Sequence, residues 1–273
     1  WTQDLRLAGR SLLRRPVFTV VAALTRALGV GASTAMFSVF HGIVLQPLRY
    51  PAPERVVRLF PTVREGNPAP WTGADFVDFA RQASSYEAVA GFQYVDYSVA
   101  AGGAPRLVVG ASVTSAFFQV LAVPPLHGRL LGPASDPPGG ARVVVLGYDE
   151  WQSQLGADPS IVGRTIALAG EPFTVVGVMP PGFSCPAGAR LWTASRFRAP
   201  ERADAGLDPG EDRGDRYFNV VGRLRAGVTL DQAREEGKAI NARLAGAFPE
   251  TNRGQGFGLN PLHEDVVSSV RPM

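Results

Sequence analysis

A long apolar run near the N-terminus constrains this chain more than any other feature. Residues 16–48 read PVFTVVAALTRALGVGASTAMFSVFHGIVLQPL, and only Arg26 and His41 interrupt them with charged or ionisable side chains. A helix of about 20 mostly apolar residues is long enough to cross the hydrocarbon layer of a bilayer. We therefore expect residues 16–48 to form a transmembrane helix that tilts or continues beyond the membrane as a stalk.

Two other kinds of apolar segment fit this run less well. A signal peptide has an apolar core of roughly 7–15 residues followed by a cleavage site of small residues. Helices buried in globular cores average roughly 10–14 residues, whereas the run here has 33. Its length thus favours a membrane-spanning helix.

The segment before the run carries an orientation signal. In residues 1–15 leucines are interleaved with charged residues, which predicts an amphipathic helix at a membrane surface. Its charged residues are Asp4, Arg6, Arg10, Arg14 and Arg15. They sum to +3, which is the net charge of the whole chain, so the rest of the chain is neutral. The positive-inside rule then places residues 1–15 in the cytoplasm and the residues after 48 outside it.

This distribution of charge also excludes one class of partner. Nucleic-acid-binding domains usually carry a basic face on the folded domain. Here the excess of positive charge lies in front of an apolar segment, so we expect contact with membrane lipid and with a cytoplasmic protein, and no nucleic acid.

Small residues within the run would let a second helix approach closely. The candidate helix-packing residues are Gly29, Gly31, Ala32 and Ala35, together with Arg26. An arginine near the centre of a spanning helix costs about 2.5–3.5 kcal/mol on insertion scales. Arg26 therefore either faces a protein partner or a water-filled crevice, or is a tolerated change; the sequence leaves both explanations open.

Beyond the prolines at 47, 51 and 53, the pattern becomes that of an α+β domain. A strand is expected at 55–63, a helix at 72–84 and a further strand at 88–100. Phe76, Phe79, Ala80 and Ala83 have the spacing of one helical face.

The same order of elements returns near the end of the chain. A strand at 217–225 is followed by a helix that begins at Thr229, where Gln232 completes a capping box, and then by a strand at 256–262. Two β-α-β units predict a split, ferredoxin-like α/β sandwich. Its first half would span residues 49–120 and its second half residues 213–273.

Residues 121–212 would then form an inserted, mainly β subdomain. Around and within it we expect strands at 106–114 and 142–147, and helices at 115–121 and 149–155. A hairpin is expected from 165–168 and 173–179 around a turn at 169–172. Residues 199–215 are charged and glycine-rich and indicate an exposed linker.

No catalytic, cofactor or metal site is expected from the chemistry-bearing residues. His41, His127 and His263 lack a second histidine or cysteine at zinc-ligand spacing, with His127 placed in a turn. The single cysteine, Cys185, is expected to be an inert, small packing residue. The chain has no G-x-x-x-x-G-K-[ST] phosphate-binding loop, so any ATPase must be another chain or domain.

The remaining conspicuous side chains are interpreted as structural. Asp75 and Asp78 fall in the first turn of a predicted helix, where carboxylates favour the helix dipole. Trp71, Trp151 and Trp192 are expected to be core or interface anchors rather than a ligand-stacking set.

Several segments together resemble one known family. They are DLRLAGRSLLRRPVFT (4–19), ALGVGASTAMFSVFHGIVLQPLRYPAPERVVRL (27–59), GRLLGP (128–133), VVVLGYDEWQSQLGADPSIVGRTIALAGEPFTVVGVMPPGF (143–183), LRAGVTLDQAREE (224–236) and PETN (249–252). This set resembles the MacB-like ABC transporter permeases, and most closely the large permeases of acidobacterial type.

The resemblance implies an inner-membrane protein with four membrane helices, one before the periplasmic domain and three after it. The chain, which begins at Trp1, would then be a piece of a longer protein. The resemblance also implies a porter-like subdomain with an inserted, mainly β (Sabre) subdomain. Arg26 departs from the family, which has an aliphatic residue at that position.

The implied partners are an ABC ATPase subunit, a second permease copy and a periplasmic adaptor. The implied activity is efflux or export, with ATP hydrolysis coupled to motions of the periplasmic domain. Arg6, Arg10, Arg14 and Arg15 would contact the ATPase. One alternative is a membrane signalling or regulatory protein that controls a periplasmic enzyme, and a more distant one is a membrane-anchored enzyme.

Overall fold

The computed structural model describes residues 25–27, 29–31, 50–63, 66–100, 105–135, 140–195 and 213–263. The chain forms two compact units, residues 1–47 and 48–273. In the first unit only helical turns at 25–27 and 29–31 are described, so the predicted amphipathic helix 1–15 and most of the run 16–48 lie outside the described residues. None of the helices within the described ranges has the length and apolarity needed to span a bilayer.

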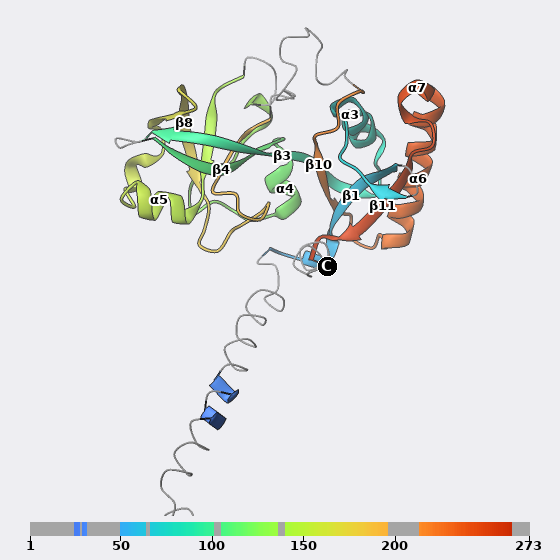
Figure 1. Cartoon of the computed structure of the whole chain (residues 1–273). Helices are drawn as coiled ribbons and strands as arrows, with labels where there is room; N and C mark the ends of the chain where they lie inside the picture. The colour runs from blue at the N-terminus through green and yellow to red at the C-terminus, as the bar shows by residue number, and fades with distance from the viewer. Residues whose placement is uncertain are drawn as a thin grey trace, which may run out of the picture. The chain divides into compact units, whose positions relative to one another are not determined.

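Two β-α-β units, far apart in the sequence, build one half of the sheet in the second unit (Figure 1). The first β-α-β unit comprises β1 (Val56–Val63), α3 (Gly73–Gln82) and β3 (Tyr86–Ala100). The second β-α-β unit comprises β10 (Asn219–Leu224), α6 (Leu230–Ala247) and β11 (Gly256–Pro261). Their strands interleave in the order β11-β1-β10-β3, and each neighbouring pair is antiparallel. The predicted succession of strands and helices is therefore confirmed in both units.

Both helices begin where the sequence predicts. The Thr72 side chain accepts a hydrogen bond from the Asp75 amide at the start of α3. At the start of α6, Thr229 and Gln232 form the complete capping box. Such caps satisfy backbone donors that have no partner inside the helix.

The helices α3 and α6 cover one face of this half-sheet. Phe79 from α3 and Ile240 from α6 enter the same buried cluster as Leu59 of β1. The ring of Phe79 stacks on that of Phe257 of β11, with 5.5 Å between ring centroids. Gly237 permits this close approach, because a Cβ at that position would lie 2.1 Å from Phe257. Burial of aromatic and aliphatic surface supplies most of the stability of such a layer.

Five further strands extend the sheet beyond β3. They are β4 (Arg106–Val113), β9 (Leu191–Ala194), β6 (Val143–Leu146), β8 (Glu171–Val178) and β5 (His127–Gly128), in that spatial order. The pairs β4–β9 and β6–β8 are parallel. A further strand, β7 (Thr165–Leu168), pairs with β8 and with the end of β3. The short β2 (Asn67–Pro68) pairs with β1.

The remaining elements are short helices. They are η1 (Pro53–Arg55), α4 (Phe117–Leu121), η2 (Pro133–Ser135), α5 (Tyr148–Gln154), η3 (Pro159–Ile161) and α7 (Pro249–Asn252). Figure 1 shows α3, α6 and α7 gathered on the β1–β11 side of the sheet, with α5 at the opposite side.

Strand β6, inside this second half of the sheet, is buried on both faces. In β6, Val143 and Val145 belong to the cluster that contains α4, whereas Val144 and Leu146 belong to the cluster that contains Trp151 of α5. A strand that is covered on both faces reads as a continuous apolar run, which explains the VVVL sequence.

The long strand β3 belongs to both halves. Its residues Tyr86–Phe92 pair with β10, and Phe92–Val99 pair with β4. We call the strands β11, β1 and β10 with the first part of β3 the helix-covered half, and the strands from β4 to β5 with the second part of β3 the mainly β half. Strand β3 therefore links the two halves through backbone hydrogen bonds.

Two local predictions need correction. The β7–β8 turn consists of Ala169 and Gly170 alone, and Glu171 and Pro172 already pair in β8. Both turn residues have positive φ, 52° and 79°, as a two-residue hairpin of type I′ requires. His127 lies in β5, opposite Val178, and not in a turn.

Candidate functional site

The residues singled out from the N-terminal sequence are mostly outside the described ranges. This applies to Arg6, Arg10, Arg14, Arg15, Ala32 and Ala35. Arg26, Gly29 and Gly31 lie in helical turns and are exposed. A Cβ added at either glycine would meet nothing within 4 Å, so both positions are open to a neighbouring helix. Their roles stay predictions.

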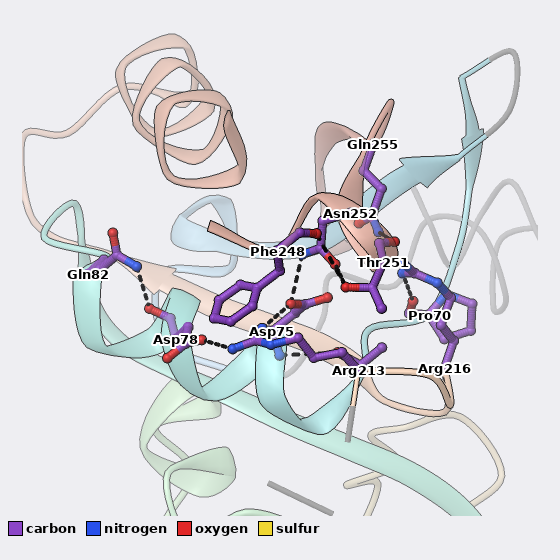
Figure 2. A network of polar contacts seen from close by, with 11 residues as sticks. Pro70, Asp75, Asp78, Gln82, Arg213, Arg216, Phe248, Thr251, Asn252 and Gln255 are labelled. Atoms are coloured by element: carbon purple, nitrogen blue, oxygen red, sulfur yellow. Dashed lines mark hydrogen bonds and ion pairs between the residues drawn. The ribbon is translucent and has the colours of Figure 1, made fainter. Parts of the chain in front are cut away.

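The most developed polar cluster of the described residues centres on Asp75 (Figure 2). Asp75 lies in the first turn of α3 and is 3% exposed. The Arg213 guanidinium donates from one nitrogen to Asp75 and from another to Asp78. The Asn252 amide of α7 donates to the same Asp75 oxygen, Oδ1, at 2.9 Å. A buried carboxylate is tolerated when charge and hydrogen bonds compensate it in this way.

Contacts around Arg213 extend the cluster on both sides. Its guanidinium carbon lies 3.4 Å from the ring centroid of Phe248, which is within cation–π range. Arg216 donates to the Pro70 carbonyl at 3.2 Å. Burial lowers the pKa of Arg216, and the charge of Asp75 opposes that shift. The cluster thus ties the start of α3, the chain leading into β10 and α7 to one another.

This geometry agrees with a structural role for Asp75 and Asp78, but the sequence did not reveal their partner. Arg213 falls in the charged stretch 199–215, which we predicted to be an exposed linker. That prediction is wrong for Arg213, whose side chain is 16% exposed. Residues 196–212 lie outside the described part of the chain. No local pattern in this charged stretch distinguishes Arg213 as the partner of Asp75 and Asp78.

A second buried acid lies in the mainly β half. Glu150 of α5 is 1% exposed and forms an ion pair with Arg106 of β4. Neither of its carboxylate oxygens meets hydrogen-bond geometry with any described residue. Burial lowers the pKa of Arg106, and the nearby positive charge of Arg190 lowers it further. Asp75 likewise keeps one oxygen, Oδ2, without a hydrogen-bond partner among the described residues. The two acids differ in their partners. Asp75 has the mostly buried Arg213 and the buried Asn252. Glu150 has Arg106, whose side chain is one-third exposed.

Trp71, Trp151 and Trp192 are core residues, as expected. Trp71 and Trp192 are fully buried and Trp151 nearly so. Each indole N–H donates to a backbone carbonyl, those of Leu59, Cys185 and Asp158. Cys185 is buried, as the sequence predicted, and burial raises the pKa of its thiol to about 12.

Within the described ranges, no group of three or more histidine, cysteine or acidic side chains is arranged to hold a metal ion. The His127 ring lies against Trp151, with 5.2 Å between ring centroids. A different feature faces solvent on β3 and β4, where Tyr94, Leu107 and Val109 form a small exposed apolar patch. The patch shares its face with the exposed Asp96 and Ser98. Apolar patches of this kind often mark contact surfaces.

The sequence matches a known family of periplasmic domains. A family model described as the MacB-like periplasmic core domain matches residues 19–240. No curated protein sequence matches the chain.

Three solved structures are similar in fold. The extracellular domain of the noncanonic ABC-type transporter YknZ from Gram-positive bacteria has a TM-score of 0.54 at 16% identity, over 74% of this chain and 99% of that one. The periplasmic region of MacB from Actinobacillus actinomycetemcomitans has a TM-score of 0.56 at 15% identity, over 80% and 94%. A domain of a putative permease protein from Porphyromonas gingivalis has a TM-score of 0.59 at 13% identity, over 78% and 92%.

Proposed function

Because the chain belongs to the family of MacB-like periplasmic core domains, we propose that it is part of the permease subunit of an ABC-type efflux or export system. The family match over residues 19–240 carries this proposal. The mixed α+β fold, shared with the periplasmic region of MacB, supports it. In this proposal the permease itself is not an enzyme, and ATP is hydrolysed by a partner subunit.

We assign the two β-α-β units to a ferredoxin-like porter subdomain, residues 49–120 and 213–273. The strand order β11-β1-β10-β3 and the two helices on one face support this assignment. Residues 121–212 form the inserted, Sabre-like subdomain, whose described part is mainly β. Strand β3 then connects the two subdomains.

The N-terminal region completes the proposal. Residues 16–48 cross the inner membrane, and residues 1–15 contact the ATPase through Arg6, Arg10, Arg14 and Arg15. Gly29, Gly31, Ala32 and Ala35 pack against another membrane helix, for instance of the second permease copy. The periplasmic domain then moves in response to ATP hydrolysis, and the patch of Tyr94, Leu107 and Val109 is available to a periplasmic adaptor.

The test is reconstitution of the full-length permease in a bilayer with the ABC ATPase encoded beside it. We expect the two proteins to copurify and the permease to stimulate ATP hydrolysis. Removal of residues 1–15 should return hydrolysis to the level of the ATPase alone. Normal stimulation without those residues would refute their role, and a failure of the two proteins to associate would refute the permease assignment.

The partner recovered from the periplasm separates the proposal from its alternative. Immobilised periplasmic domain should retain an adaptor through the exposed patch, and Leu107→Asp should release it. Recovery of a periplasmic hydrolase in place of an adaptor would favour a regulatory protein that controls an enzyme.

A further inference from the structure

Residues 50–55, here called the junction segment, follow the apolar run in sequence and lead into β1. Two arginines hold the backbone near this segment. Arg55 donates from Nε to the Leu224 carbonyl at 2.8 Å, and Arg223 donates from Nη2 to the Pro51 carbonyl at 3.0 Å. Both hydrogen bonds join the junction segment to β10, and in each the donor and the acceptor residue are about 170 positions apart in sequence.

Arg223 is the more unusual of the two arginines. It lies within β10 and is 3% exposed. Besides Pro51 it binds the Val120 carbonyl, at 2.7 Å from Nε. Among the described residues no carboxylate forms an ion pair with it. Burial lowers its pKa and the neighbouring Arg55 guanidinium lowers it further, whereas the charges of Glu87 and Glu54 oppose the shift. Burying an arginine is unfavourable unless its donors are satisfied, and here two backbone carbonyls from different segments accept from the one guanidinium.

The two acceptors show which segments this arginine connects. Val120 is in the last turn of α4, whose final carbonyls have no partner within the helix and carry partial negative charge. Pro51 is in the junction segment. The planar guanidinium thus joins the junction segment, β10 and α4 through a single rigid group.

Helix α4 carries the connection into the mainly β half. The ring of Phe118 lies 6.2 Å from those of Phe183 and Trp192. A second link starts from the junction segment itself, because the half-buried Tyr50 packs against the apolar cluster that contains Cys185. Both halves of the sheet are therefore attached to the residues that follow the predicted membrane helix.

We propose that Arg223 is a positioning residue that transmits displacement of the junction segment to β10 and, through α4, to the inserted subdomain. This inference rests on the proposed function as a permease. It predicts that weakening the Arg223 bridge uncouples the periplasmic domain from the ATPase without unfolding either half of the sheet.

The chain offers a matched control. Arg225 follows two residues later and donates from Nε to the Ser84 carbonyl at 2.9 Å, but it is exposed and does not contact the junction segment. Arg223→Lys keeps the positive charge, yet one ammonium group on a flexible stem cannot reproduce the rigid bridge between two carbonyls. Arg225→Lys makes the same chemical change outside the bridge.

The experiment uses the full-length permease with its ATPase in a bilayer. Backbone hydrogen exchange is measured for residues 50–56 and 117–122, with residues 143–146 of β6 as an internal reference. In Arg223→Lys we expect exchange of the first two segments to accelerate by about tenfold or more, as expected when a hydrogen bond from a charged donor is lost. Residues 143–146 should be unchanged, and stimulation of ATP hydrolysis should fall although the ATPase still binds.

Three results would overturn the inference. The first is unchanged exchange and stimulation in Arg223→Lys, and the second is an equal loss in Arg225→Lys. The third is independent opening of residues 50–56 and 117–122 in the unaltered protein, where the bridge requires the two segments to open together. This measurement can be made even if the variant fails to fold. If the ATPase does not bind the wild type, the proposed function fails, while the exchange measurements still decide the bridge.

Discussion

The two halves of the sheet share β3 but differ in the direction of their strand pairs and in what covers their faces. In the helix-covered half, all neighbouring strands are antiparallel and two amphipathic helices cover one face. In the mainly β half, two parallel pairs occur, and strand β6 is buried on both faces. A half that is covered by helices carries local signals such as helical spacing and caps. The parallel pairs of the mainly β half join strands that are distant in sequence and leave no such local signal; in the helix-covered half the same is true of the pairs that β10 makes with β1 and β3.

The halves also differ in how they accommodate a buried acid. Asp75 accepts hydrogen bonds from Arg213 and Asn252. Glu150 has Arg106 as its ion-pair partner, and the Arg106 side chain is one-third exposed. Removal of one partner of a well-bonded buried pair is costly, whereas a poorly compensated buried charge contributes little net stability.

The largest expected effect tests this difference. Asp75→Asn should lower the free energy of unfolding by about 3 kcal/mol, because it leaves the Arg213 guanidinium without its buried carboxylate. Glu150→Gln should change it by less than about 1 kcal/mol, because Arg106 is one-third exposed and can be hydrated. Urea denaturation of the periplasmic domain measures both. Equal losses would show that the two acids are equivalent and would remove this part of the comparison.

A smaller effect is expected inside the helix-covered half. Gly237→Ala should lower the free energy of unfolding by about 1–3 kcal/mol, since its Cβ would overlap the Phe257 ring and force it to move. Gly246→Ala is the matched control on the same helix, because a Cβ there meets nothing within 4 Å. It should raise stability by up to about 1 kcal/mol through helix propensity. Thermal unfolding of the two variants would show opposite shifts; shifts of the same sign would argue against tight α6–β11 packing.

The smallest effect concerns reactivity in the mainly β half. Burial raises the pKa of Cys185 to about 12, so the reactive thiolate is scarce at all pH values well below that and increases only as pH approaches it. Native protein should therefore react with maleimide at pH 8 far more slowly than protein in urea, as followed by mass spectrometry. Rapid labelling without denaturant would show that the surroundings of Cys185 open readily in the native protein.

The order of strands and helices in the helix-covered half could be predicted from the sequence because each signal is local. Thr229 and Gln232 are three residues apart, and Phe76 and Phe79 mark one helical face. In the mainly β half, the VVVL run indicated a buried strand, but its neighbours could not be known. Val144 pairs with Val175 on one side and Thr193 on the other, and no local pattern encodes those choices.

The polar contacts were the least predictable part of the candidate site. Asp75 and Asp78 were found from their place in a helical turn, but Arg213 is 138 residues from Asp75. In the sequence, Arg223 is one residue of a predicted strand. In the fold it is buried and binds the Val120 carbonyl of α4 and the Pro51 carbonyl of the junction segment. Such contacts depend on the assembled fold, because pairing a charge with a distant carbonyl leaves no periodic trace in the sequence.

The position of β10 between β1 and β3 has a consequence for biosynthesis. β1 and β3 leave the ribosome more than 100 residues before β10, so neither can pair with its central partner until the mainly β segment has been translated. The mainly β segment lies between β3 and β10 in the chain and has its own apolar clusters, so it can begin to collapse before β10 is made. Meanwhile the edges of β1 and β3 remain unpaired and open to other chains. The interval before β10 arrives is therefore the stage of synthesis at which this domain most needs a chaperone.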